Sequence, residues 1–184
     1  MRTFLPTGLV KGARGPLPLT VSENLLCTAE PIFTSAIIDI PMKGYFKPHN
    51  PAKYNGDPTN IIYRSSWEKR CMIYFDRNPN VLNWSSEEMF VPYKSPIDGR
   101  YHRYFPDFII KIKNKSGELE TVMIEVKPFY QTQEPEKKTK LTKKYINEVK
   151  TYAINKYKWD AAIEYCRDRQ WRFQILTENE LGLK

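Results

Sequence analysis

The chain has 184 residues, of which 41% are hydrophobic and 14% aromatic, and this composition predicts one folded domain with a sizeable core, not a disordered chain. Its three cysteines are an odd number with no CxxC pair, which indicates a reducing compartment and argues against a disulfide framework or a structural zinc site. Only two histidines are present, too few to favour a histidine-based nuclease or zinc hydrolase.

The net charge of +8 is unevenly distributed. Residues 1–41 hold three of the 29 basic and three of the 21 acidic residues, which leaves 26 basic and 18 acidic residues in 42–184. A basic body of this kind favours a polyanionic partner, with nucleic acid as the first candidate.

Residues 1–41 show no sustained periodicity and hold five of the fourteen prolines. We predict a weakly ordered N-terminal arm there, with a strand or short helix at 32–40 as the alternative, and a folded domain over 42–184. No apolar run in the chain approaches the ~20 residues that span a bilayer, so no membrane segment is expected.

From residue 59 the pattern becomes regular. Thr59 or Asn60 is predicted to cap a helix over 61–77, whose apolar residues recur at helical spacing. Two short strands follow, at 81–84 and 89–93, and the proline of the second limits it to an edge or a strand end.

The segment 104–128 carries two apolar runs around a polar turn at 114–117 and predicts a β-hairpin. A loop, a helical segment over 141–169, with two helices broken near Lys158 as the alternative, and a strand at 171–177 complete the chain. The order predicts an α/β fold in which helices flank a mixed sheet.

Three ionisable residues interrupt the hydrophobic hairpin. If it turns symmetrically about Ser116, Asp107 lies across from Glu125, close enough for both carboxylates to share one divalent ion. Period-two alternation places Glu125 and Lys127 on the same face. The alternative is an Asp–Lys–Glu ion network at a sheet edge with no bound metal.

The motif "PDF" followed by "IEVK" resembles the PD-(D/E)XK endonuclease superfamily, which cuts phosphodiester bonds with a divalent metal. That resemblance implies a restriction-endonuclease-like αβββαβ core. It also implies an acidic residue on the first helix, a position that Glu68 in "RSSWEKR" matches. More narrowly, "KGYFKPHNPAKYNGDPTNIIYRSSWE", "WSSEE", "YFPDF" and "EVKP" resemble, over residues 42–180, the head-completion nuclease family of large tailed phages, related to TnsA-like endonucleases.

The resemblance implies the catalytic set Glu68, Asp107, Glu125 and Lys127. Asp107 and Glu125, with Glu68, would hold Mg²⁺, or Mn²⁺ as the alternative. The expected function is a DNA endonuclease that acts on packaged DNA ends, with capsid portal or head–tail proteins as partners. Its expected location is the host cytoplasm during assembly and then the virion. The alternatives are a non-catalytic DNA-end-binding adaptor and a transposon- or repair-type nuclease.

Two further groups are weighed against simpler roles. Glu87 and Glu88 in "WSSEE" are either additional metal ligands or solvent-facing side chains. Exposed lysines are expected to bind DNA phosphates. For Lys137, Lys138, Lys140, Lys143 and Lys144 the alternative is a solvated helix start. For Lys43 and Lys47 it is an N-terminal strap whose aromatic residues pack on the core.

Overall fold

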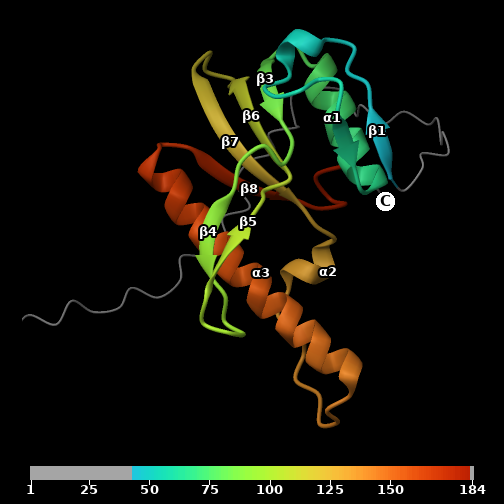
Figure 1. Ribbon diagram of the computed structural model, residues 1–184, viewed down its shortest axis with the longest axis vertical. Coiled ribbons are helices and arrows are strands. Elements are labelled where there is room, and N and C mark those ends of the chain that lie inside the picture. Colours follow the sequence, from blue (N-terminus) through green and yellow to red (C-terminus); the bar gives the residue numbers. More distant parts are fainter. Residues whose placement is uncertain (1–42, 183–184) are drawn as a thin grey trace, which may run out of the picture.

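A computed structural model describes residues 43–182, and the predicted arm lies outside them. Its centre is a four-stranded sheet in the order β3-β6-β7-β8 (Figure 1). The strands are β3 (Val81–Ser85), β6 (Phe108–Lys113), β7 (Leu119–Val126) and β8 (Arg172–Leu176). The first three form an antiparallel meander, and β8 pairs parallel to β7.

A parallel neighbour requires a long crossover, which helix α3 (Lys143–Asp168) supplies. With α1 (Ser66–Arg77) before the meander, the order of elements is the predicted αβββαβ core. The fold class predicted from the sequence is therefore confirmed.

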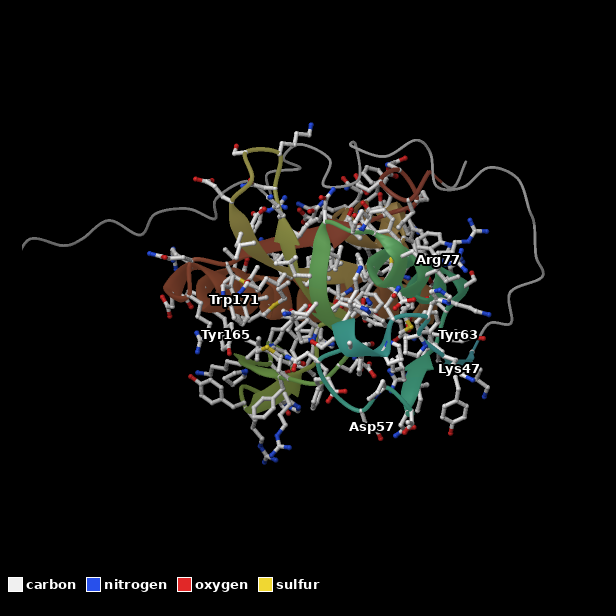
Figure 2. All side chains as sticks on the ribbon, turned by 90° about the horizontal axis from the view of Figure 1, so that it is seen from above. Lys47, Asp57, Tyr63, Arg77, Tyr165 and Trp171 are labelled. Carbon is white, nitrogen blue, oxygen red and sulfur yellow. The ribbon has the colours of Figure 1, made fainter. Side chains whose placement is uncertain are left out.

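The two faces of the sheet are covered by different layers. One face packs against α1 and the small sheet of β1 (Gly44–Phe46) and β2 (Ile61–Tyr63). The other packs against α3 and the two-stranded ribbon of β4 (Val91–Lys94) and β5 (Tyr101–Tyr104). In the view of Figure 2, Lys47 and Tyr63 of the first layer lie across the molecule from Tyr165 and Trp171 at the end of α3.

Alternation along β6 and β7 assigns side chains to these layers. Phe108 and Ile110 belong to the cluster on the α1 side, together with Trp84 and Phe75. Met123 belongs to the cluster on the α3 side. The sheet is thus apolar on both faces through its centre. Charged side chains lie at its two ends: Glu120 and Arg172 form an ion pair at one, and Asp107, Glu125 and Lys127 lie where β6 begins and β7 ends.

The predicted helix over 61–77 begins later than expected. Residues 61–63 form strand β2, in which Ile61 and Tyr63 are buried while Ile62 is exposed. The helix is capped by Ser65, whose Oγ accepts a hydrogen bond from the Glu68 amide at 3.1 Å. A short apolar run does not distinguish strand from helix, and here pairing with β1 decides for strand.

Four other features of the structure differ from the predictions or were not anticipated. Helix α3 runs without a break through Lys158, and a short helix, α2 (Phe129–Thr132), lies in the predicted loop. Strand β5 was not anticipated as a partner for β4, because its residues are mostly exposed and show no alternation. The 3-10 turn η1 (Pro51–Lys53) was also not anticipated.

Candidate active site

Asp107 and Glu125 come together at one end of the β6–β7 hairpin. The last paired residues are Phe108 and Ile124, and the same register carried one residue further sets Asp107 against Glu125. Asp107 Oδ2 accepts a hydrogen bond from the Val126 amide at 2.7 Å. The symmetric turn predicted from the sequence is confirmed, and with it the opposition of the two acids.

Glu125 is held by two donors. Lys127 Nζ lies 2.9 Å from Oε1, and the Tyr104 hydroxyl donates to Oε2 at 2.7 Å. Glu125 is only 3% exposed, so both bonds form in a setting with little competing water. The shared face predicted for Glu125 and Lys127 is confirmed.

Tyr104 was missed from the sequence. It lies at the end of β5, is buried, and enters the site because the β4–β5 ribbon packs beside the sheet. Its only sequence signal is its position three residues before Asp107 in "YFPDF".

The charges around Asp107 and Glu125 favour a bound cation. Burial, followed by the charge of Glu125, raises the pKa of Asp107 to about 8, although Lys127 and the Val126 amide act in the opposite direction. Burial alone would lower the pKa of Lys127, but the nearby carboxylates of Glu125 and Asp107 outweigh it and the pKa is raised. The lysine therefore carries its proton at neutral pH, and two acids still compete for one compensating charge.

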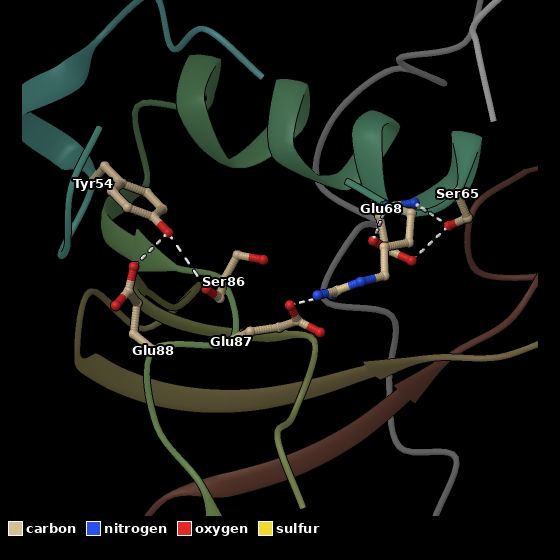
Figure 3. Close-up of polar contacts among 7 residues, drawn as sticks. Tyr54, Ser65, Glu68, Ser86, Glu87 and Glu88 are labelled. Carbon is tan, nitrogen blue, oxygen red and sulfur yellow. Dashed lines mark hydrogen bonds and ion pairs between the residues drawn. The ribbon is translucent and has the colours of Figure 1, made fainter. Parts of the chain in front are cut away.

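Glu68 reaches the same region from α1. Its Oε1 accepts from the Ser65 hydroxyl at 2.9 Å and its Oε2 from the Arg64 amide at 2.7 Å (Figure 3). This is a form of capping box, and the S-x-x-E spacing of Ser65 and Glu68 was a signal that could have located the helix start. The charge of Glu68 adds a smaller contribution to the raised pKa values of Asp107 and Lys127, so it lies within electrostatic reach of both.

Glu87 and Glu88 both have protein partners. Glu87 forms an ion pair with Arg64, and Glu88 Oε1 accepts from the Tyr54 hydroxyl at 3.0 Å (Figure 3). Glu88 also packs so closely on Gly56 that a Cβ there would lie 2.3 Å from its Oε1. Neither acid simply faces solvent, and Glu88 is fixed as a structural contact between the η1 region and the loop after β3.

The predicted DNA-binding lysines form two separate groups. Lys137, Lys138 and Lys140 lie in the loop before α3, and Lys143 and Lys144 begin that helix; all are exposed. Lys43 and Lys47 are also exposed but flank β1 in the other layer, away from the start of α3 (Figure 1). Their contact with DNA remains a prediction.

The donor set suits a hard divalent cation. Within residues 43–182 no three acidic, histidine or cysteine side chains converge as a ready-made cage. Mg²⁺ does not require one, because it commonly takes one or two carboxylates and fills its other positions with water and substrate phosphate. Asp107 and Glu125 supply such carboxylates, and their mutual repulsion is what a cation would relieve. The residues present therefore fit the group.

No helix among the described residues combines the length and hydrophobicity needed to cross a bilayer.

Comparison with known proteins adds two matches. Residues 78–178 match the family model described as the TnsA-like endonuclease N terminal domain, so the matched segment runs from the end of α1 to just beyond β8. The chain is also 41% identical, over 142 residues, to the head completion nuclease of Enterobacteria phage T4, an alignment that covers 75% of this chain and 92% of the relative. The chain belongs to the TnsA-like endonuclease family, to which its fold and its hairpin motif had pointed.

Proposed function

We propose that this protein is a Mg²⁺-dependent endonuclease that hydrolyses DNA phosphodiester bonds, with Mn²⁺ as an alternative metal. The observation that carries the proposal is the opposition of Asp107 and Glu125 at the end of an otherwise apolar hairpin, with the Lys127 ammonium beside them. Buried facing acids are costly for a fold to maintain unless they serve a ligand.

In this proposal Asp107 and Glu125 hold the metal. A bound divalent ion would neutralise phosphate charge, acidify water and stabilise the departing alkoxide. Lys127, protonated and fixed by Glu125, orients the attacking water and stabilises negative charge that develops on the phosphorus oxygens. Its raised pKa argues against service as a general base, because a base must first lose its proton.

Tyr104 and Glu68 have supporting roles. The Tyr104 hydroxyl occupies one Glu125 oxygen and Lys127 the other, so the carboxylate is fixed in orientation before substrate arrives. Glu68 is held in the cap of α1, close enough to add its charge to the site, and acts on the metal through water or completes a second metal position.

The relative from phage T4 is named a head completion nuclease. We propose that this chain acts at the corresponding step, on the ends of packaged DNA, together with portal or head–tail proteins. It would work in the host cytoplasm during assembly and then remain with the virion.

The test is nicking of supercoiled plasmid DNA with Mg²⁺, with Mn²⁺ and with EDTA. The wild-type protein should cut only with a divalent ion, and Asp107→Asn and Lys127→Ala should abolish cutting. Asp98→Asn and Lys113→Ala are matched controls, because both residues are exposed and lie outside the site. Equal cutting by all variants would refute the proposal, and DNA binding without cutting by the wild-type protein would favour the adaptor alternative.

A further inference from the structure

Arg64 is tied to the active site by its backbone. It precedes the cap residue Ser65, and its amide donates to Glu68 Oε2 at 2.7 Å. Its side chain is 59% exposed and reaches across to Glu87. The Arg64 backbone is therefore anchored to Glu68, while most of its side chain remains open to solvent.

Glu87 lies at the same end of the sheet as Asp107. Ser85, the last residue of β3, pairs with Ile109 of β6; Glu87 follows Ser85 by two residues, and Asp107 precedes Ile109 by two. Glu87 itself adopts a left-handed backbone conformation (φ 55°), which is uncommon outside glycine and is a form of local strain typical of functional loops. Figure 3 shows its carboxylate directed toward the side of α1 that carries Glu68.

The ion pair therefore joins the residue before the cap of α1 to the loop that follows β3. The hydrogen bond to Glu87 is the largest cause that raises the pKa of Arg64, and the charges of Glu68 and Asp107 act in the same direction. The guanidinium therefore lies within electrostatic reach of Glu68 and Asp107.

The charge balance of the site calls for such a cation. Carboxylates repel the phosphates of DNA, and the ammonium group of Lys127 is already bonded to Glu125. A guanidinium has five donors in a planar fork that matches phosphate geometry. Within residues 43–182, the polar contact of the Arg64 guanidinium is Nη1 with Glu87, so the remaining donors are available for a ligand.

We propose that Arg64 binds a phosphate of the DNA strand beside the scissile bond, and that Glu87 orients its guanidinium for that contact. This inference rests on the proposed function in one respect, namely that DNA is the substrate. It adds a substrate-binding residue to the acid pair and Lys127, and it assigns Glu87 a positioning role in place of metal ligation.

The first measurement is binding of a fluorescein-labelled 20-base-pair DNA duplex by anisotropy, in EDTA, over a series of salt concentrations. Arg64→Ala should weaken binding about tenfold and reduce the slope of log affinity against log salt by about 1. Arg167→Ala is the matched control, because Arg167 is 61% exposed and pairs with Glu164 on α3, so this variant should behave as wild type. Identical affinities and slopes for Arg64→Ala and wild type would overturn the inference.

Glu87→Gln separates a DNA contact from a merely structural ion pair. It removes the charge of Glu87 but keeps a side-chain oxygen that can still accept from the guanidinium and orient it, and it takes one negative charge away from the bound phosphate. Affinity should therefore rise about two- to fivefold, opposite to Arg64→Ala. Equal weakening by the two variants would show that the pair only supports the fold and would also overturn the inference.

Failure of this inference is distinguishable from failure of the proposed function. Binding is measured without metal, so the comparison of Arg64→Ala with Arg167→Ala is decided even for a protein that does not cut DNA. Arg64→Lys supplies a further readout: it keeps the charge and hence the salt slope, but loses the planar fork and part of the affinity. Thermal unfolding should be nearly unchanged in all four variants, because exposed ion pairs contribute little stability.

Discussion

Lys127 and Glu125 lie on the same face of the chain at the end of β7, with Nζ 2.9 Å from Oε1. Because burial would otherwise lower its pKa, the lysine owes its charge to the acids around it. Lys127 and the acid pair therefore function as one electrostatic unit, in which removal of any member changes the charge state of the others.

Replacement of Lys127 should slow the chemistry strongly without loss of the fold. Lys127→Ala is expected to lower the rate of DNA cleavage about 10²- to 10³-fold, the range found when one preorganised charge donor is removed from an active site. Single-turnover cleavage of a labelled duplex with saturating enzyme measures this directly. A variant that cuts within threefold of the wild-type rate would contradict the role given to Lys127.

Asp107 should make the metal-free protein less stable as pH rises. Its pKa in the folded state is about 8, against 3.8 for the free group, so the folded protein binds the extra proton. The stability that this provides is fully present below about pH 4 and is lost as pH rises to about 8. In EDTA, the free energy of unfolding contributed by this group should fall across that window.

Asp107→Asn tests that dependence. The amide cannot ionise and still accepts from the Val126 amide, so at pH 8.5 in EDTA the variant should be more stable than wild type by about 1–3 kcal/mol. Urea unfolding at pH 5 and pH 8.5 gives the comparison. Equal stabilities of the two proteins at pH 8.5 would show that Asp107 is not strained in the folded protein.

Tyr104→Phe removes one hydroxyl and keeps the ring. Without its hydrogen bond the Glu125 carboxylate is less firmly oriented, and we expect about tenfold slower cleavage with little change in DNA affinity. Tyr93→Phe is the matched control, since Tyr93 is also buried and lies on the paired strand of the same ribbon. Similar losses in both variants would assign Tyr104 to packing alone.

Two substitutions at the cap of α1 should affect stability and activity differently. Ser65→Ala removes the cap acceptor and should lower stability by about 1 kcal/mol while cleavage at 25 °C changes little. Glu68→Gln keeps an oxygen for the cap but loses its charge, so it should lower cleavage more than the melting temperature. The opposite ranking would identify Glu68 as a helix cap and nothing more.

The sequence was informative where local rules decide the outcome. Because the turn at 114–117 is short, the register of the two strands could be predicted, and with it the opposition of the two acids. Because successive side chains point to opposite faces of a strand, the shared face of Glu125 and Lys127 could be predicted as well. The order of helices and strands could be predicted for the same reason, because local sequence patterns decide it. The predicted start of α1 was wrong because the apolar run Ile61–Tyr63 fits a strand as well as a helix. The S-x-x-E spacing of Ser65 and Glu68 was nevertheless present as a signal for the true start.

Features created by tertiary contacts were not predictable. Tyr104 enters the site only because the ribbon packs on the sheet, and the Arg64–Glu87 pair joins residues from two separate loops. The exposure of two apolar residues of α3 was equally a matter of tertiary packing. Ile146 and Val149 are exposed because the first half of the helix extends past the sheet (Figure 1), while contacts near Ala162 anchor the second half.

The measurement that tests the central claim most directly is calorimetric titration of Mg²⁺, and separately Mn²⁺, into wild-type protein, Asp107→Asn and Glu125→Gln. We predict a binding isotherm for the wild-type protein that is lost or weakened at least tenfold in each variant, while Glu88→Gln binds as wild type. Wild-type isotherms in both acid variants would place the metal elsewhere and contradict the account.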